Sequence, residues 1–247
     1  MNDWFSWNGA RSTEYGVYVE KLPPVTIAKE RASYEEIAGR SGSITMLEGD
    51  CVYDDVVLAM DCWMREGADA SAIAAWLRGN GKLRMPNRPN GYYLGRLNGQ
   101  IEMDKVIPAR GHRRFTLTWR CRPFLRLDDP ETKIYTASGG VLQNPGTAPG
   151  LARITIAGSG FFSLTIGMQT VFFRGVEDGI ILDPELCDAF TLDGALLAND
   201  WMDGDFFDGI QPGENMVSWL TGGEDDDGTT MPGSISSVKI EPVWRCY

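Results

Sequence analysis

The sequence predicts a mainly β protein of two domains, with one helix in the first domain. Short alternating runs separated by Gly, Pro, Asn and Asp predict many short strands. Only the stretch near residues 70–78 has a helical period. The charge also changes along the chain: residues 1–132 hold 18 Lys and Arg and 18 Asp and Glu, whereas residues 133–247 hold 5 and 16. We therefore expect domains over 1–132 and 133–247, meeting different neighbours or, equally well, differing only by a solvated acidic face.

The first domain begins with a series of predicted strands. Ser43–Leu47 and Asp54–Trp63 both alternate. In the longer run one face carries the apolar side chains Val56, Leu58, Met60 and Cys62. The polar stretch Glu30–Gly42 precedes them and is expected to be a flexible arm or a loop that orders against a neighbour.

The one predicted helix lies between Asp69 and Gly79. Asp69 or Ser71 can cap its first turn, because a side-chain oxygen there accepts from free backbone N–H groups. Ile73, Trp76 and Leu77 fall on one face, which should pack against a sheet. Gly79 is placed to end the helix with a positive φ.

Two hairpins and a linker are predicted from turn residues. Asn98-Gly99 should join a strand over Tyr92–Leu97 to one over Gln100–Val106. Phe115–Phe124 is the expected last strand of the first domain, and Leu125–Gly140 the linker. Gly158 and Gly160 should turn a strand at Arg153–Ile156 into a second one at Phe161–Ile166.

The remaining strands of the second domain are predicted at regular spacing between Gly, Pro and Asp, as in an all-β sandwich. They lie at Val171–Arg174, Ile180–Asp183, Phe190–Leu192, Val217–Leu220 and Ser236–Trp244.

Composition excludes several classes of function. An acidic chain without a basic cluster among stacking aromatics is a poor binder of nucleic acid. The sequence has no long apolar run for a membrane span and no signal peptide at its start. Its five scattered cysteines form no C-x-x-C pair, which favours reduced, buried thiols over disulfides or a zinc site.

The motifs of enzymes are missing as well. His112 is the only histidine, lies among arginines and is expected on a surface turn. The acids Asp200, Asp203, Asp205 and Asp208 do not have the spacing of a calcium loop. We therefore expect no catalytic site, no cofactor and no metal.

Several segments, taken together and in order, resemble the distal tail proteins of long-tailed phages that infect mainly Gram-positive bacteria. The opening WNGARSTEYGVYV, the run RSGSITMLEGDCVYDDVVLAM, and AWLRGNGKL followed by NGYYLGRL are similar to landmarks of that family's first domain, which FTLTWRCRPF would close. NPGTAPGLARITIAGSG, IILDPE and IQPGENMVSW are similar to landmarks of its second domain.

The resemblance implies a structural virion protein without enzymatic activity. A β-barrel-like N-terminal domain with one helix would form a homohexameric ring, and a galectin-like C-terminal β-sandwich would project from it. The ring would lie at the distal end of a non-contractile tail, assembled in the host cytoplasm. Its partners would be the major tail tube protein, the tail-associated tip protein and, in many members, the receptor-binding protein.

The candidate interface consists of the arm Glu30–Gly42 and of two turns of the first domain, Arg84–Asn90 and Pro108–Arg114. The basic side chains of the two turns are the candidate contact residues: Arg84, Arg88, Arg110, Arg113 and Arg114. The hypothesis is that they contact other subunits or the tube; ordinary solvated loops are the equally weighted alternative.

The main alternative function is carbohydrate binding by the second domain, as in a lectin-like tail or adhesion protein. Trp201 or Trp219 would then stack on a sugar ring, although most tryptophans of a sandwich are core residues. A tail-tip hydrolase is a third reading, for which the sequence offers no recognisable site.

Overall fold

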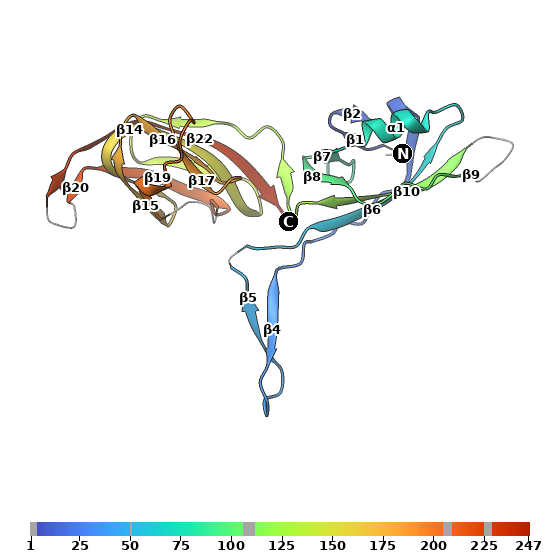
Figure 1. The fold of residues 1–247 in the computed structure, drawn as a ribbon, viewed down its shortest axis with the longest axis horizontal. Helices are drawn as coiled ribbons and strands as arrows, with labels where there is room; N and C mark the ends of the chain where they lie inside the picture. Colours follow the sequence, from blue (N-terminus) through green and yellow to red (C-terminus); the bar gives the residue numbers. More distant parts are fainter. Residues whose placement is uncertain (1–3, 50, 106–111, 205–208, 225–228) are drawn as a thin grey trace. The chain divides into compact units, whose positions relative to one another are not determined.

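The computed structural model describes residues 4–49, 51–105, 112–204, 209–224 and 229–247. The chain divides into two compact units: an N-terminal unit of residues 1–128 with Tyr247, and a C-terminal unit of residues 129–246. Both are built from antiparallel strands, and the described residues contain a single α-helix (Figure 1). No helix in these ranges is long and apolar enough to cross a membrane.

The N-terminal unit contains one main sheet and one separate hairpin. Its elements are β1 (Ser6–Trp7), β2 (Ala10–Arg11), the 3-10 helix η1 (Ser12–Tyr15), β3 (Val17–Lys21), β4 (Ala32–Glu36), β5 (Ser43–Leu47), β6 (Val56–Met64), α1 (Ala70–Trp76), β7 (Asn80–Arg84), β8 (Gly91–Leu97), β9 (Asp104–Lys105), β10 (Arg113–Cys121) and β11 (Leu125–Leu127). In the sheet the strands follow the order β3-β6-β10-β8-β7-β1-β2.

The centre of this sheet is the pair β6–β10, which runs in register from Val56 opposite Cys121 to Met64 opposite Arg113. The predicted apolar face of β6 is confirmed, because Val56, Leu58, Met60 and Cys62 are all buried. Phe115, Leu117, Trp119 and Cys121 of β10 are buried on the same side. Strict alternation places this whole set against the core, and a slip of one residue would expose it.

Helix α1 packs its predicted face inward. Asp69 caps it by accepting from the Ser71 N–H at 2.8 Å, and Ile73 and Leu77 are fully buried. The Trp76 ring stacks between Phe5 and Tyr15, and its indole N–H donates to the Trp7 carbonyl. Gly79 has a φ of +87° just past the helix, as predicted.

The hairpin predicted across Asn98-Gly99 is wrong. Gly99 does have a positive φ, but residues 100–103 form no strand and Asn98 N–H donates to the Thr118 carbonyl instead. Strand β8 is already paired with β7 on one side and with β10 and β11 on the other, which leaves it no free edge. Among the described residues 100–105 the only strand is the short β9 (Asp104–Lys105), which pairs with β10, and Val106 lies outside the described residues.

The polar arm forms a hairpin of its own. Strands β4 and β5 pair from Ala32 opposite Leu47 to Glu36 opposite Ser43, and they form no ladder with the main sheet. Gly39 and Gly42, each with a φ of +83°, lie in the connection. Figure 1 shows it as a long two-stranded projection.

The C-terminal unit is organised on one long strand. Its elements are β12 (Lys133–Tyr135), β13 (Gly140–Asn144), β14 (Ala148–Ile166), β15 (Gln169–Val176), β16 (Gly179–Asp183), β17 (Asp188–Thr191), the 3-10 helix η2 (Asn199–Trp201), β18 (Met202–Asp203), β19 (Gly213–Thr221), β20 (Gly223–Glu224), β21 (Thr230–Met231) and β22 (Gly233–Cys246). The first part of β14 pairs with β16 and β22, and its last part pairs with β15 and β19.

The predicted hairpin at Gly158 and Gly160 is therefore wrong, because both glycines lie inside β14. The register of its pairing shifts at each of them. A Cβ would lie 2.3 Å from the Ser234 carbonyl oxygen at Gly158 and 2.2 Å from the Pro232 carbonyl oxygen at Gly160. The glycines allow β22 to approach closely and β14 to change partners without ending.

The expected linker Leu125–Gly140 also contains structure. Residues 125–127 form β11, which pairs with β8, and residues 133–135 form β12, which pairs with β22. Each strand is only three residues long, too short for its own sequence to show a period. Their pairing comes from a neighbouring strand that is remote in sequence.

Candidate functional site

The β4–β5 hairpin of the N-terminal unit is largely exposed. Tyr34 is 61% exposed and Met46 50%, and Ile37 and Leu47 are similarly open. A lone two-stranded hairpin is marginally stable in water, and apolar side chains on it favour a covering partner. The hairpin therefore has the properties of an interaction element.

The base of this hairpin is held by backbone hydrogen bonds, with one exposed ion pair beside them. Glu30 bridges Tyr53, the Arg31 N–H donates to the Val52 carbonyl at 2.9 Å, and the Arg31 guanidinium contacts the Asp54 carboxylate at 3.0 Å. The contacts fix where the hairpin leaves the unit.

Two of the candidate arginines have partners within their own unit. Arg84 forms an ion pair with Asp128, and its guanidinium lies 5.3 Å from the centre of the Tyr92 ring. Arg88 donates to the Tyr247 carbonyl at 2.6 Å. These contacts give both side chains a role inside the fold.

The other candidate arginines lie at the start of β10. Arg113 donates to the Met103 carbonyl at 3.2 Å, and Arg114 pairs with Glu20 at 3.1 Å in an exposed contact. Arg110 lies outside the described residues. Exposed ion pairs of this kind contribute little to stability and leave the side chains able to change partners.

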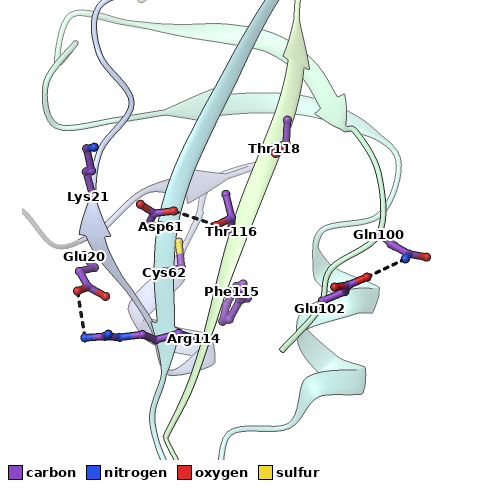
Figure 2. Close-up of a pocket in the computed structure, with 10 residues that line it drawn as sticks. All are labelled: Glu20, Lys21, Asp61, Cys62, Gln100, Glu102, Arg114, Phe115, Thr116 and Thr118. Atoms are coloured by element: carbon purple, nitrogen blue, oxygen red, sulfur yellow. Dashed lines mark hydrogen bonds and ion pairs between the residues drawn. The ribbon is translucent and has the colours of Figure 1, made fainter. Parts of the chain in front are cut away.

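A broad groove of about 870 Å³ lies beside Arg114, over the polar face of β3, β6 and β10 (Figure 2). Its hydrogen bonds are between its own side chains: Thr116 with Asp61 at 2.9 Å, and Gln100 with Glu102 at 3.0 Å. The sequence did not predict this groove, and the only feature that could have indicated it is the polar side of β6. Wide, polar and open, it is suited to a macromolecular contact rather than to enclosing a small substrate.

The groove contains no activated nucleophile. Burial, followed by the charge of Asp61, raises the pKa of the Cys62 thiol to about 12, so the thiol is protonated at neutral pH. The expectation for His112 needs correction, because its ring is half-buried and packs edge-on against Trp63 at 5.3 Å.

The two candidate tryptophans of the C-terminal unit have different environments. Trp219 is half-buried on the same side of β19 as the fully buried Val217, and it pairs across the ladder with Leu164. Trp201, at the end of η2, is half-buried and lines a surface pocket of about 460 Å³. Of the two, Trp201 is thus the one that lines a described pocket.

Metal ligation finds no support in the part of the chain that is described, where no group of three or more His, Cys, Asp or Glu side chains could hold an ion. Asp200 and Asp203 are within this part, and Asp205 and Asp208 are outside it.

Comparison with known proteins is informative at the level of structure. No protein-family model matches the sequence, and no curated protein matches it. Among solved structures, the chain is similar to the Dit protein of phage SPP1, with a TM-score of 0.66, 13% identity and 98% of each chain covered. That protein is described as a paradigm of the hub adsorption apparatus in phages that infect Gram-positive bacteria.

Proposed function

We propose that this protein is a structural component of a phage tail tip, because its chain has the fold of the SPP1 Dit protein over nearly its whole length. It forms a hexameric ring at the distal end of a long non-contractile tail. The ring connects the tail tube to the tip and to the host-recognition apparatus, and the protein catalyses no reaction.

The observation that carries this proposal is the coverage of 98% in both directions. A single shared sandwich would match many unrelated proteins, and fold alone does not define function. Here both units of this chain are covered by one alignment with the SPP1 protein, so the two proteins share the order of their domains as well as a fold. In the proposal the N-terminal unit is the β-barrel-like ring former, and the C-terminal unit is the galectin-like sandwich.

The β4–β5 hairpin is the best candidate for a contact between subunits. A closed ring needs one surface on each subunit and a different, complementary surface on the next. An element with exposed Tyr34, Ile37 and Met46, held at its base by the backbone hydrogen bond from Arg31 to Val52, supplies one of these surfaces.

The hypothesis that five arginines contact another subunit or the tube is now restricted mainly to three of them. Arg84 and Arg88 already bind Asp128 and Tyr247, so their removal would act first on the fold. Arg113 and Arg114 hold weaker, exposed contacts and, with Arg110, remain proposed contacts to a subunit or to the tube.

The test is the absolute mass of the purified chain by light scattering, followed by negative-stain imaging. A ring of six 27.3 kDa chains has a mass of about 164 kDa and six-fold symmetry in projection. A monomer at every concentration, with and without the tube and tip proteins of the same phage, would contradict the proposal.

Carbohydrate binding is the second candidate, and the place of Trp201 in a pocket is the observation that favours it. It predicts binding on a glycan array that is lost in Trp201→Ala and retained in Trp219→Phe. The composition of the pocket, however, favours a different occupant.

A further inference from the structure

The pocket beside Trp201 is assembled from three segments of the C-terminal unit. The turn between β15 and β16 contributes Glu177 and Asp178, the loop after β17 contributes Leu192, Asp193 and Leu196, and η2 contributes Trp201. The loop is closed by backbone hydrogen bonds from Thr191 to Leu196 at 3.0 Å and from Gly194 to Thr191 at 2.7 Å. Much of the pocket wall is therefore formed before any ligand arrives.

The charge of the pocket is negative throughout. Among its described lining residues three side chains are carboxylates, and none is Lys, Arg or His. The surrounding sequence has the same character: residues 175–238 contain 15 Asp and Glu and no basic residue. Anionic ligands are repelled from such a surface, and cations are concentrated at it.

One of the carboxylates is fixed in place. Asp193 accepts from the Thr191 hydroxyl at 2.6 Å and from the Ala195 N–H at 3.0 Å. The Thr191 hydrogen bond is the largest cause of the lowered pKa of Asp193, so this carboxyl is ionised at neutral pH.

Besides Gly179 and Thr191, the rest of the lining consists of apolar side chains, and further exposed leucine surface lies next to it. Leu196 is 68% exposed, its neighbour Leu197 is 65% exposed, and Leu192 is also exposed. Trp201 presents a partly open indole, the aromatic side chain that attracts cations most strongly. An occupant with both a positive charge and apolar carbon would match this lining.

We propose that this pocket binds a lysine or arginine side chain carried by an apolar-flanked segment of a partner protein. The ammonium or guanidinium group lies among Glu177, Asp178 and Asp193, and the aliphatic stem lies along Trp201. Apolar neighbours in the same segment cover Leu196 and Leu197.

Other occupants match the lining less well. A metal ion needs several ligands on one centre, and no such group exists in the described residues. A neutral sugar would stack on Trp201 but would leave three charges without a counter-ion. A small polyamine would satisfy the charges and leave the leucines exposed.

The experiment measures fluorescence anisotropy of a labelled nonapeptide that carries two lysines and two leucines among glycines and serines. The full chain should bind this peptide at least about tenfold more tightly than a matched peptide with norleucine in place of both lysines. Trp201→Leu, and separately the double variant Glu177→Gln with Asp178→Asn, should each weaken binding at least about fivefold.

The matched control is the double variant Glu214→Gln with Glu241→Gln, which makes the same change of net charge outside the pocket. Its affinity should stay within about twofold of the parent chain, and thermal melts should confirm that every variant is folded. Equal losses in the control and the pocket variants would overturn the proposal, as would absent binding or equal binding of the norleucine peptide. Displacement of the peptide by millimolar lactose would assign the pocket to sugar instead. The outcome does not depend on ring formation, so it can fail while the hub function stands.

Discussion

The N-terminal unit contains two antiparallel strand pairs with opposite environments. In β6–β10 every second side chain is buried, whereas in β4–β5 nearly every side chain is exposed. Both pairs have regular ladders. The difference teaches that a strand pair in this protein can serve either to build the core or to reach outward, and that burial rather than hydrogen bonding separates the two roles.

Thiol chemistry should show the largest contrast between the two pairs. Burial raises the pKa of Cys62 in β6 to about 12, so less than about one thiol in a thousand is ionised at pH 8. A cysteine placed in the hairpin by Ser43→Cys would be solvent-exposed. It should react with iodoacetamide at least about a thousandfold faster than Cys62, as followed by peptide mass spectrometry. Comparable rates would mean that β6 opens readily.

Removing a buried side chain should be the next largest effect. Leu117→Ala in β10 deletes a fully buried side chain and should lower the free energy of unfolding by about 3 kcal/mol. Chemical denaturation measures the loss. The control Tyr34→Ala in β4 should change it by less than about 0.5 kcal/mol, and a similar loss in both would contradict the division between core and projecting strands.

Ring assembly, in contrast to folding stability, should depend on the exposed side chains of the hairpin. Replacing Tyr34, Ile37 and Met46 together by serine removes exposed apolar surface and should leave the unfolding transition of the dilute chain nearly unchanged. The same variant should need at least about tenfold more protein to reach the ring mass in light scattering, because interface energy is concentrated in a few apolar side chains. Normal assembly of this variant would show that the hairpin is not part of the subunit interface.

Charge reversal should have the smallest effect of the series. Changing Arg110, Arg113 and Arg114 to glutamate should weaken assembly by a few-fold, mainly at low salt, because exposed charges are screened. Light scattering at two salt concentrations tests this. An unchanged ring would eliminate these arginines. Reversal of Lys133, Arg153 and Arg174 in the C-terminal unit makes the same change of charge and serves as the control.

The sequence predicted elements whose signals are local. The alternation of β6 and the cap and apolar face of α1 depend on neighbouring residues, and the structure confirms both. Asn98-Gly99 and Gly158 with Gly160 were misleading for the opposite reason. Whether a glycine ends a strand or lets another backbone approach depends on partners such as Thr118 or Ser234, which are distant in sequence.

The candidate sites were less predictable than the fold. The exposed arm was visible as a polar stretch, but its hairpin pairing was not. Arg84 and Arg88 looked available because Asp128 and Tyr247 are remote in sequence. Trp201 was identified by residue type alone, and its pocket depends on three segments that only folding brings together.

The continuity of β14 has a mechanical consequence. Its 19 residues carry the ladder to β16 and β22 and then the ladder to β15 and β19, with no break between them. Tension applied to either set of strands must pass along the same backbone to the other. The C-terminal unit should therefore rupture in a single step when pulled, rather than release one set of strands before the other.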